Sequence, residues 1–132
     1  MNNEELARLA NGWVAYRHDP KNEATWSEWS RSDQHLSELI EDWPLAAWRL
    51  ILAILDLDQS MAVMQTLSAG PLEDLLWKHG PLMIEAIETQ ARTDPSFARL
   101  LGGVWQNNMT EEIWARVQAV WDRRGWDGIP EA

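Results

Sequence analysis

Residues 70–97 read GPLEDLLWKHGPLMIEAIETQARTDPSF and contain three points at which one helix can end and another can begin. At Gly70-Pro71 and Gly80-Pro81, glycine suits the left-handed position just after a helix, and proline suits the first turn of the next one. At Asp94-Pro95, a capping carboxylate precedes the same proline start. The segment therefore predicts three helices joined by very short turns, with positive φ at both glycines.

Apolar residues recur at helical spacing through the rest of the chain, and no window alternates apolar and polar residues as a strand does. Other helices are predicted to begin near Asn2 or Asn3, near Asn22 or Thr25, at a Ser32 or Asp33 cap, at Pro44, at a Ser60 cap and at a Thr110 cap. The helix after Pro44 is apolar nearly all round, which predicts a central helix with almost complete burial of Trp48. The apolar stripes also assign Trp43, Leu45 and Leu82 to the core, and the last helix is expected to end at Gly125.

These features predict an all-α fold of about eight or nine short helices. Because short connections make successive helices antiparallel neighbours, the predicted architecture is a stack of helical hairpins, an α-α superhelix of the HEAT or armadillo kind. An irregular orthogonal bundle of the same helices is the alternative. Residues 1–132 are expected to form a single domain whose tail, residues 126–132, is loosely packed.

The composition excludes several classes of function. The chain has 11 Lys and Arg against 21 Asp and Glu, a net charge of −10, so a nucleic-acid partner is not expected. It has no cysteine, which excludes disulfides, thiol catalysis and cysteine-ligated metals. The first residues are polar and acidic, unlike a signal peptide, and no apolar run approaches the roughly 20 residues that span a bilayer. We therefore expect a soluble, cytoplasmic protein without a membrane partner.

Tryptophan is the unusual component, with ten residues beside one tyrosine and one phenylalanine. A buried tryptophan hides about 150–250 Å² of surface, so ten of them exceed what a small core normally takes up. Several indoles are therefore expected to stay partly exposed. A partly exposed tryptophan is a residue type often found as an anchor in protein interfaces.

The block Gly70-Pro71-Leu72-Glu73-Asp74-Leu75-Leu76, followed by His79-Gly80, resembles the hallmark of a bacterial family, domain of unknown function 6869. Trp43-Pro44 with Ala47-Trp48, and Asp94-Pro95-Ser96-Phe97 leading to Leu100-Leu101 and Trp105, are similar to the family's other blocks. The resemblance covers residues 40–118 and, loosely, Trp13 to Tyr16. It implies an all-helical, armadillo-like fold and no particular reaction.

The same block holds the best candidate functional cluster, Glu73, Asp74, Trp77 and His79. Carboxylates in a first helical turn favour the positive end of the helix, and an imidazole in a last turn can donate to free carbonyls. Each residue therefore has a structural explanation beside the functional one, which is a small enzyme using Glu73, Asp74 and His79. Neither a complete set of metal ligands nor a nucleophile with its base is recognisable, so no catalytic residue, metal or cofactor is predicted.

A second candidate site is an interface formed by Trp26, Trp29, Glu23 and Glu28. Residues 21–34 are mostly polar, so no wide apolar stripe is available to bury both indoles, although both can fold back onto the first helix. The two glutamates favour a basic protein partner. The leading interpretation is a protein-binding module, such as an immunity or antitoxin-type inhibitor. A structural subunit that self-associates through its tryptophans is the remaining alternative.

Overall fold

The structure is a computed structural model that describes residues 1–19 and 21–127, with the side chains of all of these except Arg17 and His18. Every regular element in this part of the chain is helical, so the predicted all-α class is confirmed. The chain divides into two compact units, Met1–Val63 and Met64–Ala132. The single domain stays a prediction, and most of the predicted loose tail, residues 128–132, lies outside the described residues.

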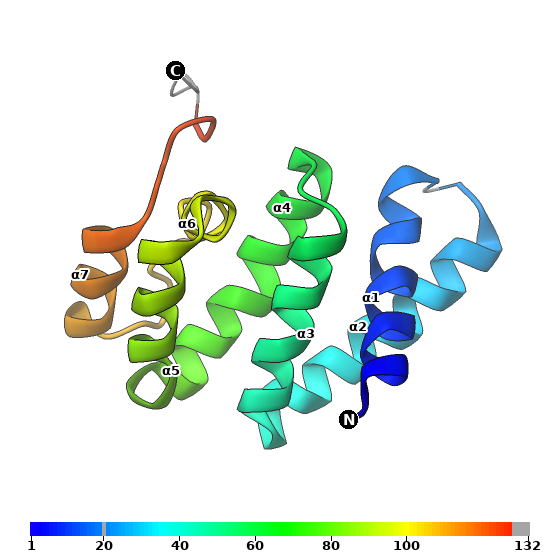
Figure 1. Cartoon of the computed structure of the whole chain (residues 1–132), viewed down its shortest axis with the longest axis horizontal. Coiled ribbons are helices and arrows are strands. Elements are labelled where there is room, and N and C mark those ends of the chain that lie inside the picture. Colours follow the sequence, from blue (N-terminus) through cyan, green and yellow to red (C-terminus); the bar gives the residue numbers. More distant parts are fainter. Residues whose placement is uncertain (20, 128–132) are drawn as a thin grey trace. The chain divides into compact units, whose positions relative to one another are not determined.

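The first unit contains α1 (Asn3–His18), α2 (Glu23–Asp42) and α3 (Pro44–Leu57). Helices α1 and α2 run in opposite directions, and α3 packs against both (Figure 1). The predicted starts of the first two helices are confirmed, since Asn2 Oδ1 accepts the Glu5 N–H at 2.8 Å and Asn22 Oδ1 accepts the Ala24 N–H at 2.8 Å. The fully buried side chains of this unit include Leu9, Trp13, Leu36, Leu50, Ile51 and Ile54.

Helix α2 is one helix of 20 residues, so the prediction of two separate helices in this range is wrong. The helix contains neither glycine nor proline, and Ser32, expected as a cap, is 4% exposed in its interior. Ser32 faces Gly12 of α1, where a Cβ would lie 2.8 Å from the serine Oγ. The small residue therefore allows two helices to approach closely and does not start a helix.

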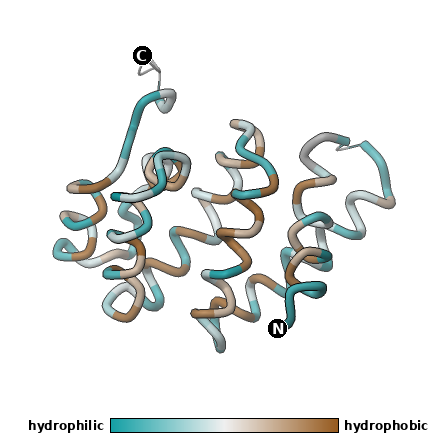
Figure 2. Tube along the Cα trace, viewed as in Figure 1, coloured by the Kyte–Doolittle hydropathy of each residue, from teal (hydrophilic) through white to brown (hydrophobic). Residues whose placement is uncertain are grey.

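Helix α3 begins at Pro44 as predicted, but its neighbours cover one face of it. The buried positions are Ala47, Leu50, Ile51, Ile54 and Leu55. Leu45 is 62% exposed, Trp43 is 69% exposed between α2 and α3, and Trp48 is half-buried. The predicted burial of these three side chains is therefore wrong, because a helix that is apolar all round offers more surface than its neighbours can cover. Figure 2 shows the hydrophobic positions of α3 in brown.

Three elements follow one another without a loop: α4 (Met61–Leu67), the π-helical turn η1 (Ser68–Leu72) and α5 (Glu73–Thr93). The predicted break at Gly70-Pro71 is wrong, because η1 accommodates Pro71 within the continuous helix. Gly70 does not have positive φ, and no atom lies within 4 Å of the place where its Cβ would be. A proline lacks the N–H that an α-helix needs, and a turn with i to i+5 bonding tolerates that loss.

The second Gly-Pro junction does interrupt the helix, although by another device than the one predicted. The backbone leaves helical geometry at His79, where φ is −134° and ψ is 31°, because the Pro81 ring cannot fit a regular turn. Gly80 has no positive φ, so the predicted left-handed position is wrong. Gly80 instead allows close packing of α5 on α7, since a Cβ at this position would lie 3.1 Å from Ile113 Cγ1. Leu82, predicted as core, is 61% exposed just after the kink.

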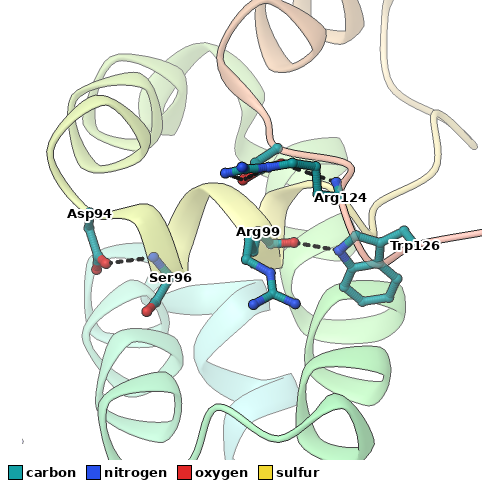
Figure 3. A network of polar contacts seen from close by, with 6 residues as sticks. Asp94, Ser96, Arg99, Arg124 and Trp126 are labelled. Atoms are coloured by element: carbon teal, nitrogen blue, oxygen red, sulfur yellow. Dashed lines mark hydrogen bonds and ion pairs between the residues drawn. The ribbon is translucent and has the colours of Figure 1, made fainter. Parts of the chain in front are cut away.

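The second unit is completed by α6 (Pro95–Leu101), α7 (Glu111–Val120) and an irregular segment after α7. The predicted caps Asp94 and Thr110 are confirmed, whereas α7 ends at Val120 and not at Gly125. Gly125, with φ of 88°, lies in a turn farther on, which leads Trp126 back to α6. Figure 3 shows the indole Nε1–H of Trp126 donating to the Arg99 carbonyl at 2.7 Å, which satisfies a free acceptor near the end of α6.

Candidate functional site

Glu73, the first residue of α5, belongs to the predicted cluster and is buried, with 6% of its surface exposed. Its Oε1 accepts the backbone N–H of Trp105 at 2.5 Å, and its Oε2 accepts the side-chain amide of Asn107 at 3.0 Å. Both donors lie in the connection between α6 and α7. The carboxylate therefore fastens this connection to the start of α5.

Burial raises the pKa of Glu73 above its ordinary value, because the charged form loses contact with water. The Trp105 N–H opposes this effect, the negative charge of Asp74 adds to it, and the Asn107 amide again lowers the pKa. A raised pKa in a buried acid is often a sign of a functional site. Here each carboxylate oxygen holds a hydrogen bond from the protein itself, which accounts for the burial without a ligand.

The other members of the predicted cluster do not converge on Glu73. Asp74 is exposed, and residues next to each other in a helix point about 100° apart, so the two carboxylates face different directions. His79 is partly exposed at the kink of α5. Trp77 lies one turn after Glu73 on the same face, with 47% of its surface exposed and the Lys78 ammonium 5.4 Å from its ring centroid.

The sequence does not identify the two partners of Glu73, Trp105 and Asn107, as members of this site. Asn107 has φ of 43°, a left-handed value that asparagine tolerates better than most residues. The indole of Trp105 is 58% exposed although its backbone N–H is held by Glu73. The glycines and asparagines of residues 102–108 indicate a loop, but nothing in the sequence connects that loop to a glutamate 32 residues earlier.

The predicted interface in the first unit is partly brought together. Trp26 is 52% exposed in the first turns of α2, which confirms that at least one indole of this segment remains exposed. Glu23, three residues before it, is exposed on the same helix face. Trp29 packs on Tyr16 of α1, with ring centroids 5.4 Å apart, so this indole does fold back onto the first helix.

Glu28 points elsewhere, because it lines a pocket between α1 and α2 together with Arg8 and Arg31. Residues two apart in a helix do not share a face, so Glu28 does not adjoin Trp26. The structure therefore groups Glu23 with Trp26 and places Glu28 on the α1 side of the same helix.

The ten tryptophans divide by exposure, and all ten lie in the described part of the chain. Trp26, Trp43, Trp77 and Trp105 are exposed, and Trp13 and Trp126 are buried. The remaining four are intermediate. The prediction that several indoles stay partly exposed is confirmed. Among the residues that the structure describes, no group of three or more histidines and carboxylates is placed to hold a metal ion.

A family model described as "Family of unknown function (DUF6869)" matches residues 17–125. The chain belongs to this family. The match confirms the resemblance seen in the Gly70 to Gly80 block and extends it over α2. Both Trp26 in α2 and Glu73 in α5 lie within the matched residues. Comparisons with curated proteins and with solved structures find no match. Within residues 1–19 and 21–127, no helix is long and apolar enough to cross a membrane.

Proposed function

We propose that this member of the DUF6869 family is a protein-binding module whose contact surface is centred on Trp26. The observation that carries the proposal is the exposure of the indole, which is 52% accessible on a helix whose other aromatic residue, Trp29, is packed on Tyr16. An exposed indole on a rigid helix can fill a pocket of a partner at little cost in conformational entropy.

The charge of the chain favours a basic partner. Glu23 is exposed on the same face as Trp26, and the whole protein carries a net charge of −10. Opposite charge around an interface speeds the encounter of two proteins and disfavours partners of like charge. An immunity or antitoxin-type inhibitor, which captures a basic toxin in the bacterial cytoplasm, is the specific form of the proposal.

The proposed architecture is a stack of antiparallel helical hairpins of the HEAT or armadillo kind. The antiparallel pair of α1 and α2 supports it, since such pairs are the repeating element of these folds (Figure 1). Folds of this kind present long rows of helix ends and faces on which partners bind.

The test is affinity capture from the native host with the wild type, Trp26→Ala and Trp43→Ala. Trp43 is the matched control, because it is a still more exposed indole in the same unit, 69% against 52%, without Glu23 beside it. We expect a basic partner that both the wild type and Trp43→Ala retain and that Trp26→Ala binds at least about tenfold more weakly. Equal binding by all three proteins would contradict the proposed surface.

Sedimentation equilibrium separates this proposal from self-association. A monomer at micromolar concentration for both the wild type and Trp26→Ala is expected. A wild-type dimer that Trp26→Ala dissociates would replace the proposal by the homo-oligomer alternative. Glu23→Gln should weaken partner binding mainly at low salt, since exposed charges are screened over about 10 Å at 0.1 M salt.

A further inference from the structure

The pocket between α1 and α2 has a volume of about 250 Å³ and is separate from the Trp26 face. Three residues of each helix line it, spaced at i, i+3 and i+4, so that one face of each helix is turned toward the other. The lining residues are Arg8, Asn11 and Gly12 from α1 and Glu28, Arg31 and Ser32 from α2.

Gly12 keeps the floor of the pocket open. A Cβ at this position would lie 2.8 Å from Ser32 Oγ and 3.3 Å from the Glu28 carbonyl, so any other residue would press on the serine hydroxyl. Ser32 itself is 4% exposed, and its hydroxyl makes no hydrogen bond to another residue in the described part of the chain. A hydroxyl without a protein partner is free to donate a hydrogen bond to a ligand in the pocket.

The two arginines are also available for a ligand. Neither Arg8 nor Arg31 forms an ion pair or hydrogen bond with a described residue, in a chain where acidic residues outnumber basic ones 21 to 11. The arginines elsewhere that have acidic partners include Arg116 on Glu88 and Arg124 on Asp122. With Glu28 as its one acidic residue, the lining of the pocket carries a net charge of +1, opposite in sign to the whole protein.

We propose that this pocket binds a phosphate group, either free phosphate or the phosphate of a small monoester. The planar guanidinium donates two parallel hydrogen bonds to a phosphate, and arginine is common in phosphate sites for this reason. The Ser32 hydroxyl is a third donor, at the bottom of the pocket. A carboxylate has two oxygens for these three donors, whereas a phosphate has at least three free oxygens. The volume is below the roughly 300–1,000 Å³ of drug-sized sites, which fits a small anion or its phosphate end.

Replacing Glu28 should change phosphate affinity in the opposite direction from replacing either arginine. Its carboxylate lines the same pocket and repels a bound anion, so Glu28→Gln should tighten phosphate binding. Arg8→Gln or Arg31→Gln should weaken it by roughly 10- to 100-fold, the loss expected for a hydrogen bond between charged groups. A nonspecific effect of charge on the protein surface does not require these residues more than others.

The experiment is a titration with sodium phosphate, phenyl phosphate and sodium acetate at about pH 7.5, where a phosphate monoester is mostly dianionic. Ionic strength is matched with sodium chloride, and binding is read from the amide NMR signals of Gly12 and Ser32 and from calorimetry. Arg49→Gln is the matched control, because Arg49 lies in the same unit and already donates to the Met1 carbonyl at 3.2 Å. Melting temperatures verify folding, and Arg8→Lys, which keeps the charge, serves as a second variant.

The expected result is saturable binding of phosphate that Arg8→Gln weakens by roughly 10- to 100-fold, Arg49→Gln leaves unchanged and Glu28→Gln strengthens. Tighter binding of phenyl phosphate identifies a monoester as the ligand, and tighter binding of inorganic phosphate identifies the free ion. Acetate binding as tight as that of phosphate, or phosphate binding that Arg8→Gln and Arg31→Gln leave unchanged, would overturn the proposal. Neither result bears on partner binding through Trp26.

Discussion

Removing the Glu73 side chain should release the connection between α6 and α7. In Glu73→Ala, the Trp105 N–H and the Asn107 amide both lose the acceptor that they have in the folded protein. Hydrogen bonds to a charged group contribute about 1.5–3 kcal/mol each, so two of them amount to about 3–6 kcal/mol. The burial that raises the pKa of Glu73 shows that part of this gain is spent on desolvating the carboxylate. We therefore expect a net loss of about 2–4 kcal/mol.

Urea denaturation followed by far-UV circular dichroism measures this loss, and hydrogen exchange of the Trp105 amide locates it. The matched control is Asp74→Ala, which removes the neighbouring, exposed carboxylate and is expected to cost under about 1 kcal/mol. Exchange at Trp105 should accelerate in Glu73→Ala and not in Asp74→Ala. A loss below about 1 kcal/mol for Glu73→Ala, or equal losses for the two variants, would refute the fastening role of Glu73.

Three further predictions follow from the same unit. The wild type should lose stability relative to Glu73→Gln as pH rises from the ordinary Glu73 pKa of 4.5 through the raised pKa of the folded state, because the folded protein holds the proton more tightly. Urea titrations at several pH values measure the difference in the free energy of unfolding between the two proteins. A difference that stays flat or rises with pH contradicts the prediction. Gly70→Ala should leave the protein's stability unchanged or raise it by up to about 1 kcal/mol, because the added Cβ meets no other atom. Gly80→Ala should destabilise the protein by about 1–3 kcal/mol, because the added Cβ presses on Ile113. Similar melting temperatures for the two variants would contradict this difference between the two glycines. Trp126→Phe should cost about 1 kcal/mol through the lost bond to the Arg99 carbonyl, with α6 amides exchanging faster; unchanged exchange there would show that the indole does not hold α6.

Helix starts could be predicted from the sequence because their causes are local. Asn2, Asn22, Asp94 and Thr110 all cap within three residues of their own position, and Pro44 acts through its own ring. Interruptions were harder to predict, since they depend on what the helix packs against. A serine in a polar segment fits a cap and an interhelical contact equally well, and Gly12 on another helix decides between them for Ser32.

The candidate site shows the same limit. The family block in the sequence points to Glu73, and the exposed Trp77 lies one turn after it on the same face of α5. The partner that explains its burial, the Trp105 N–H, is a backbone group that carries no residue-type signal. The sequence also suggests that Glu23 and Glu28 share one interface, because both lie close to Trp26 along the chain. The helical phase of α2 instead places Glu28 in the pocket lined by Arg8 and Arg31.

The π-helical turn at Ser68–Leu72 bears on which changes of chain length this protein can accept. Each residue of an α-helix advances the direction of the side chains by about 100°, and a π turn holds more residues than an α turn. A one-residue deletion here can therefore be absorbed by an α turn, which leaves the face that carries Leu75 and Leu76, both buried, on its packing partners. Homologues should therefore differ by one residue at this turn or in connections such as residues 58–60. They should keep a constant residue count in the regular turns of α5, where one residue more or less rotates the buried face by about 100°.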